Sequence, residues 1–144
     1  MKRTAKAVWK GTGSEGNGKL TTQSHALSEH PYSFKSRFED EEGKSGTNPD
    51  ELIAAAHAGC FAMALGVELE GKGFTPETID VHGRVTIEKE GEGFAIKKSH
   101  LDLKATVPGL DMTTFQDLAN AAKDNCPVSK ALACDISMTA HLEQ

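Results

Sequence analysis

The segment at residues 52–69 is the longest mostly apolar stretch of the chain, and it constrains the fold more than any other feature. It is rich in alanine and contains His57 and Glu68, so it indicates a buried helix in preference to a membrane span. Asn48 or Thr47 can cap such a helix, and Pro49 suits its first turn. We therefore predict a helix that runs to about Glu70 and stops at the glycines that follow.

Shorter periodic segments surround this helix. Strands are predicted at 4–10, 18–24, 31–39, 78–90, 93–107 and 134–142, and further helices at 112–124 and 127–132. The third strand rests on Tyr32, Phe34 and Phe38 at roughly alternate positions. The pattern predicts an α+β protein of mostly antiparallel strands with two main helices. No linker interrupts it, so residues 1–144 are expected to form a single domain.

Charge and composition narrow the class of protein. The chain has 144 residues and a net charge of −5, from 16 Lys plus Arg against 21 Asp plus Glu. This balance argues against nucleic acid and anionic membranes as partners. The first six residues are followed by no apolar region of the kind that signal peptides contain. We therefore expect a cytoplasmic protein.

The three cysteines are too few for a disulfide framework, and no two are spaced as C-x-x-C. In a reducing compartment such thiols are either core filler or reactive groups. Cys134 has only Asp135 as a charged neighbour, and a carboxylate opposes ionisation of a thiol, so we interpret Cys134 as structural.

Cys60 shares a helical stripe with small and apolar residues, so it could simply be a core side chain. His57 lies three residues earlier on the same face and, if charged, would favour the thiolate. The favoured interpretation is a satisfied core or interface histidine. A zinc site on this pair lacks two further ligands at recognisable spacing.

Cys126 has the stronger local case for reactivity. It lies in Asn-Cys-Pro-Val-Ser, at or just before a helix start, where the positive helix end lowers a thiol pKa. The alternative is again a packed structural cysteine. Arg37, between Phe34 and Phe38, could stabilise a thiolate and bind peroxide oxygens, although most arginines are merely solvated. Asp50 or Glu51 could hold its guanidinium by a bidentate pair.

Four stretches in this order resemble the OsmC/Ohr family of osmotically inducible and organic hydroperoxide resistance proteins, and the OsmC branch in particular. They are Ser-Arg-Phe-Glu from Ser36, Gly-Thr-Asn-Pro-Asp-Glu-Leu from Gly46, Ala-Ala-His-Ala-Gly-Cys-Phe-Ala-Met-Ala from Ala55, and Asn-Cys-Pro-Val-Ser from Asn125. Weaker likeness extends over nearly the whole chain. Each cysteine motif alone is weak, but the two at this separation are specific.

The resemblance implies an intertwined homodimer, with two central helices wrapped by antiparallel β-sheets and active sites at the subunit interface. It assigns peroxide attack to Cys60, resolution to Cys126, and contact with thiolate and peroxide to Arg37. Local physics favours Cys126 as the attacking thiol; we follow the resemblance. The family typically has Glu where this chain has Asp50, and helix rotation still places Asp50, rather than Glu51, nearer the face of Cys60.

The resemblance also implies the chemistry. Cys60 would be oxidised by an organic hydroperoxide, and a Cys60–Cys126 disulfide would follow, reduced by a dithiol such as a lipoyl-bearing protein. No metal, flavin or haem is required. The apolar neighbours Phe61, Met63 and Phe38 would favour alkyl or lipid peroxides. A non-catalytic, stress-linked binding or structural dimer is the alternative, whereas a cysteine hydrolase fits the Cys60–His57 spacing poorly.

Overall fold

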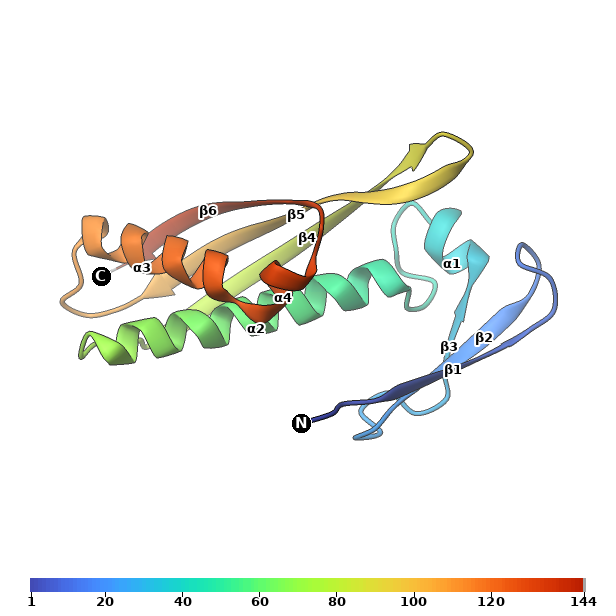
Figure 1. Cartoon of the computed structure of the whole chain (residues 1–144), viewed down its shortest axis with the longest axis horizontal. Helices are drawn as coiled ribbons and strands as arrows, with labels where there is room; N and C mark the ends of the chain where they lie inside the picture. Colours follow the sequence, from blue (N-terminus) through green and yellow to red (C-terminus); the bar gives the residue numbers. More distant parts are fainter. Residues whose placement is uncertain (144) are drawn as a thin grey trace. The chain divides into compact units, whose positions relative to one another are not determined.

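The computed structural model describes residues 1–143, which form six strands and four helices (Figure 1). In chain order these are β1 (Ala5–Lys10), β2 (Asn17–Thr22), β3 (His30–Ser33), α1 (Phe34–Phe38), α2 (Pro49–Gly71), β4 (Thr78–Glu90), β5 (Gly93–Thr106), α3 (Met112–Asn125), α4 (Pro127–Ala131) and β6 (Asp135–Glu143). Apart from residues 31–39, every predicted element is found within two residues of its predicted bounds.

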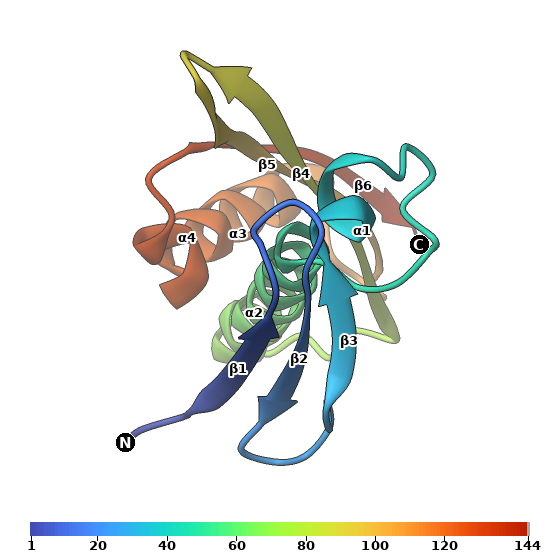
Figure 2. The same cartoon turned by 90° about the vertical axis from the view of Figure 1, so that its right-hand side faces the viewer.

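The chain divides into two compact units, Met1–Leu52 and Ile53–Gln144. The single domain expected over the whole chain stays a prediction. In the first unit, β1, β2 and β3 form an antiparallel sheet with β2 in the centre (Figure 2). Trp9 and Tyr32 lie on either side of Gly18 in the register, and their ring centroids are 5.4 Å apart. A Cβ on Gly18 would lie 2.6 Å from the Tyr32 ring, so only glycine fits there.

The prediction of a strand over residues 31–39 is wrong for its second half, because residues 34–38 form α1. Ser33 and Ser36 make a reciprocal capping box, in which each side chain accepts a hydrogen bond from the other residue's backbone N–H. Phe34 and Phe38 are four residues apart and their rings contact at a centroid distance of 4.8 Å. That spacing is typical of one helical face.

The second unit is a three-stranded sheet with α2 and α3 side by side on one face (Figure 1). Alternate residues of β5 point toward these helices, where Leu101, Leu103 and Ala105 are buried. The rest of the core is apolar and comes mostly from the two helices; it includes Phe61, Leu65, Leu69, Phe115, Leu118, Ala119 and Ala122. This packing fixes α2 and α3 relative to one another.

One strand pairing departs from the antiparallel expectation. β4 and β5 form the predicted antiparallel hairpin, but β6 pairs with β5 in parallel. A parallel pair needs a long crossover connection, and α3 and α4 supply it. The connection carries Cys126 across the helical face of the sheet, between the two helices.

The long helix α2 is buried on only one side. Asn48 Oδ1 accepts a hydrogen bond from the Glu51 backbone N–H at 2.8 Å, which caps the start as predicted. Met63 and Val67 are exposed, so the buried helix that the sequence predicted is buried only in part. By length and composition α2 could cross a membrane, a test that the core helix of a soluble protein also passes.

Candidate functional site

Cys60 and Cys126 lie together in the second unit, although they come from α2 and from the junction of α3 and α4. Both are free thiols and they are hydrogen-bonded to each other. Cys126 is completely buried and Cys60 is half-buried. Two thiols that share a hydrogen bond lie near one another in space, as a disulfide between them requires.

The backbone holds Cys126 rigidly in this position. Cys126 ends α3 and precedes the first residue of α4, Pro127. Its N–H donates to the Ala122 carbonyl at 2.9 Å, and its carbonyl accepts from the Lys130 N–H at 3.1 Å. Proline suits the first helical position because it has no N–H to leave unpaired. The Cys-Pro sequence therefore ends one helix and starts the next with the thiol at the corner.

The environment makes the two thiols unequal acids. Burial raises the pKa of Cys60, and the hydrogen bond that its S–H donates to Cys126 raises it further, against a lowering by the Val128 backbone N–H. Burial also opposes ionisation of Cys126. There, however, hydrogen bonds from Cys60, from the N–H and hydroxyl of Ser129 and from the Val128 N–H outweigh burial, and the pKa of Cys126 is lowered. Within this unit Cys126 is the better thiolate, in agreement with the local sequence argument.

His57 lies one helical turn before Cys60 and is completely buried. Its Nδ1 is 2.6 Å from Ser99 Oγ on β5, and its Nε2 is 2.8 Å from Ser129 Oγ on α4. Burial lowers the pKa of His57, so the imidazole is neutral and does not supply a positive charge to Cys60. The interpretation of His57 as a satisfied core histidine agrees with this geometry.

Arg37 and Asp50 form a second pair, in the first unit. The guanidinium contacts the carboxylate through two atoms, with Nε–Oδ2 and Nη2–Oδ1 distances of 3.1 Å each. Asp50 is buried and Arg37 is about one-third exposed, with its Cζ 4.9 Å from the centre of the Phe38 ring. Of the two candidate carboxylates it is Asp50 that holds Arg37, whereas Glu51 accepts a hydrogen bond from Thr47 Oγ1 at 2.8 Å.

A short set of contacts places Arg37 opposite Asp50. Ser36, the residue before Arg37, is buried, and its Oγ lies 3.0 Å from the Thr47 carbonyl oxygen. This contact joins α1 to the segment that leads into α2. A methylene shorter than Glu, the Asp50 side chain still reaches the guanidinium with both oxygens.

Ser99 and Ser129 were not predicted as site residues from the sequence. Ser129 left a weak signal, because it stands three residues after Cys126, where a hydroxyl at the third position of a helix can reach back to the capping residue. Ser99 left none, since serine in a strand is unremarkable and its contact with His57 is 42 residues away in sequence. Cys134 is half-buried and makes no contact with the thiol pair that the structure records.

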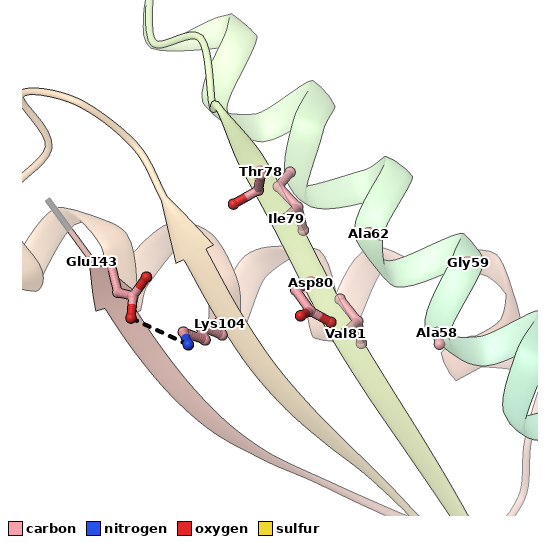
Figure 3. Close-up of a pocket in the computed structure, with 9 residues that line it drawn as sticks. All are labelled: Ala58, Gly59, Ala62, Thr78, Ile79, Asp80, Val81, Lys104 and Glu143. Atoms are coloured by element: carbon pink, nitrogen blue, oxygen red, sulfur yellow. Dashed lines mark ion pairs between the residues drawn. The ribbon is translucent and has the colours of Figure 1, made fainter.

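A pocket of the second unit lies away from the thiol pair. Figure 3 shows this pocket of ≈ 660 Å³, lined by Ala58, Gly59 and Ala62 of α2 and by the start of β4, with the Lys104–Glu143 ion pair across from them. Neither cysteine lines it. Within residues 1–143 no group of three His, Cys, Asp or Glu side chains is placed to hold a metal ion.

Comparison of the sequence with known proteins gives consistent matches. Residues 41–141 match the OsmC-like protein family. The peroxiredoxin OsmC of Escherichia coli (strain K12) is 43% identical over 141 residues, covering 98% of this chain and 96% of that protein. An organic hydroperoxide resistance protein of Xanthomonas axonopodis pv. citri is 35% identical over 101 residues, 69% of each protein.

Solved structures share the fold. The organic hydroperoxide resistance protein OhrB of Bacillus subtilis superposes with a TM-score of 0.67 at 27% identity, covering 97% of this chain and 98% of that chain. An OsmC-like protein of unknown function from Vibrio cholerae superposes with a TM-score of 0.77 at 14% identity, covering 97% and 99% of the two chains. The α+β class predicted from the sequence is confirmed, in the form that these proteins share.

Proposed function

This chain belongs to the OsmC-like protein family, and we propose that it is a thiol peroxidase that reduces organic hydroperoxides to alcohols. The observation that carries the proposal is the contact between the reduced thiols of Cys60 and Cys126. The names of the relatives, peroxiredoxin and organic hydroperoxide resistance protein, support the same reaction class.

The cycle begins when the Cys60 thiolate attacks the distal oxygen of R–O–O–H. The O–O bond breaks, the alcohol leaves after taking up a proton, and Cys60 becomes a sulfenic acid. The Cys126 thiolate then attacks the Cys60 sulfur, forming the disulfide and releasing hydroxide, which takes up a proton as water. A dithiol returns both cysteines to the reduced state by exchange.

Arg37 is proposed to lower the pKa of Cys60 and to bind the peroxide oxygens. Cys60 needs an added positive charge, because burial and its hydrogen bond to Cys126 raise its pKa. The resemblance assigns that charge to Arg37. Asp50 would act on Arg37 alone: it fixes the plane of the guanidinium through two oxygens and leaves further N–H donors for other ligands.

We propose an alkyl or lipid chain on the substrate, because α2 is apolar on both sides of Cys60 and leaves Met63 and Val67 exposed. Phe61, which the sequence offered as a further apolar neighbour of the substrate, is completely buried in the core and cannot contact it. Phe38, the third neighbour that the sequence offered, stays a prediction.

The partners follow from the same resemblance. We propose a homodimer with its active sites at the subunit interface, a dithiol reductant that a lipoyl-bearing protein could supply, and a cytoplasmic location, where free thiols persist. The face of α2 with Met63 and Val67 is apolar and exposed in the single chain, as an interface residue set would be.

Counting thiols before and after one equivalent of an alkyl hydroperoxide tests the function. The folded protein is treated with the peroxide and then denatured so that all thiols can be counted. We expect the parent to lose two of its three thiols together, with one equivalent of alcohol formed. The matched control is Cys134→Ser, which should lose both of its remaining thiols at the parental rate. A non-catalytic binding or structural dimer would lose none, and that result would refute the peroxidase.

A further inference from the structure

His57 is a completely buried, titratable side chain that the proposed cycle does not use. Both of its ring nitrogens are hydrogen-bonded to serine hydroxyls, Nδ1 to Ser99 and Nε2 to Ser129. Ser99 is itself completely buried. The Ser129 hydroxyl is also hydrogen-bonded to the Cys126 thiol, so a chain of hydrogen bonds leads from Ser99 on β5 through His57 on α2 and Ser129 on α4 to the thiol at the junction of α3 and α4.

Counting protons fixes the direction of this chain. A hydroxyl has one proton to donate, and a thiolate has none, so a thiolate can only act as an acceptor of hydrogen bonds. When Cys126 is ionised, the Ser129 hydroxyl must therefore donate to its sulfur, and Ser129 Oγ must accept from His57 Nε2–H. A neutral imidazole carries one N–H, so Nδ1 is then the acceptor for the Ser99 hydroxyl.

We propose that His57 is a positioning residue for Cys126. Its Nε2–H donates to Ser129 Oγ and so holds the Ser129 hydroxyl in the orientation that donates to the Cys126 sulfur. Ser99 fixes the tautomer by donating to Nδ1 at 2.6 Å. The three side chains together form a directed relay that ends on Cys126 and bypasses Cys60.

If the donor and acceptor roles were reversed, the Ser129 hydroxyl could not stabilise a Cys126 thiolate. If Ser129 donated to Nε2, its hydroxyl could only accept a hydrogen bond from a protonated Cys126. The proposed direction is therefore the one that stabilises the thiolate of Cys126, and burial of His57, which lowers its pKa, favours the neutral imidazole in which one nitrogen remains an acceptor.

The consequence for the cycle rests on the proposed function. When a dithiol reduces the disulfide, its thiolate attacks one sulfur and the other leaves with the electron pair of the broken S–S bond. The thiol with the lower pKa leaves faster. The relay therefore directs the reductant to Cys60: a mixed disulfide forms on Cys60, and Cys126 departs as the thiolate that Ser129 stabilises.

The test is the ionisation of Cys126 alone, followed by the ultraviolet absorbance of the thiolate against pH. Cys60→Ser with Cys134→Ser leaves Cys126 as the single thiol, and the serine at position 60 retains a donor. In this background we expect Ser129→Ala and His57→Phe each to lower the thiolate fraction at a fixed pH below the pKa by about tenfold.

The matched control is His57→Gln, whose side-chain N–H₂ can donate to Ser129 Oγ in place of Nε2–H. It should keep the thiolate fraction within about twofold of the background. If Ser129→Ala or His57→Phe folds and titrates as the background does, the relay is refuted. A glutamine variant as impaired as the phenylalanine variant would refute the directed donation.

A measurement without substitution at the relay covers the case in which His57→Phe fails to fold. Nitrogen-15 NMR of the reduced chain, above the pKa of Cys126, should show the His57 imidazole as the Nε2–H tautomer. An Nδ1–H tautomer or an imidazolium would overturn the proposal. Neither experiment involves peroxide, so an inactive enzyme with a shifted thiol would refute the peroxidase and leave the relay intact.

Discussion

The two residue pairs of the candidate site are built in opposite ways. Cys60 and Cys126 are held by hydrogen bonds from each other, from Ser129 and from neighbouring backbone, with no cation of residues 1–143 among the groups that act on them. Arg37 and Asp50 are only 13 residues apart, carry full charges, and leave the guanidinium partly exposed. The cysteine pair is positioned by hydrogen bonds and has no cationic neighbour among the described residues. The Arg37–Asp50 pair is charged, and N–H donors of its guanidinium remain exposed.

This difference shows which thiol can ionise without a neighbouring cation. No cation is among the groups that shift the pKa of Cys60 or Cys126 in the described part of the chain. Hydrogen bonds alone favour the thiolate of Cys126, so under the proposed function Cys60 needs a positive charge from another group, and we propose Arg37 for that role.

The largest effect is expected from removing the attacking thiol. Cys60→Ser should lower the single-turnover rate of alkyl hydroperoxide consumption by about a thousandfold or more, because the nucleophile is lost. Cys126→Ser should keep the first turnover within about threefold and stop at the Cys60 sulfenic acid. Stopped-flow kinetics and a sulfenic-acid trap measure both. If Cys126→Ser were the inactive variant, the more acidic thiol would be the attacking one.

Arg37→Ala is expected to have the next largest effect. It should lower kcat/KM for an alkyl hydroperoxide by about 100-fold, since one group that stabilises developing negative charge is removed. Arg37→Lys should recover only part, because an ammonium cannot form the two-atom contact with Asp50. Lys35→Ala is the matched control: it removes an exposed cation of the same helix. If the Arg37 variants were no less active than this control, Arg37 would not be the source of the positive charge.

Much of the fold could be predicted because its signals are local. The cap at Asn48, the glycines after Glu70 and the turn before Gly93 each mark an element end within a few residues. The prediction for residues 34–38 was wrong because two local signals conflicted there. The alternation of Tyr32 and Phe34 predicted a strand, and it concealed the serine pair that caps a helix turn.

The site could be predicted only in part, because its contacts are long-range. The sequence marked Cys60 and Cys126 as candidates, but the resemblance, not spacing, paired them. The relay from Ser99 through His57 to Ser129 joins residues 42 and 72 positions apart. Such contacts depend on how α2, β5 and α4 pack, and periodicity within one element does not carry that information.

A third prediction concerns the packing that positions the thiol region. A Cβ on Gly83 of β4 would lie 2.9 Å from the Ala54 carbonyl oxygen of α2, a contact with backbone that cannot move aside cheaply. Gly83→Ala should therefore lower the free energy of unfolding by about 1–3 kcal/mol, measured by urea denaturation. Gly13→Ala, in the other unit and with open space around it, should change it by less than about 0.5 kcal/mol. Equal effects would show that α2 and β4 are not closely packed.

The smallest expected effect is a pH dependence of the free energy of unfolding, caused by protonation of His57. Burial lowers the pKa of His57 below its ordinary value of 6.5, so the unfolded chain takes up a proton before the folded chain does. The stabilisation is complete above pH 6.5 and is lost as pH falls from there toward the folded pKa, by up to about 1.4 kcal/mol per pH unit. Urea denaturation at about pH 7.5 and about pH 5.5 measures it. His57→Gln has no proton to take up and should lose correspondingly less. If parent and variant lose stability equally, the folded imidazole accepts a proton as readily as the unfolded one, and burial does not lower the pKa of His57.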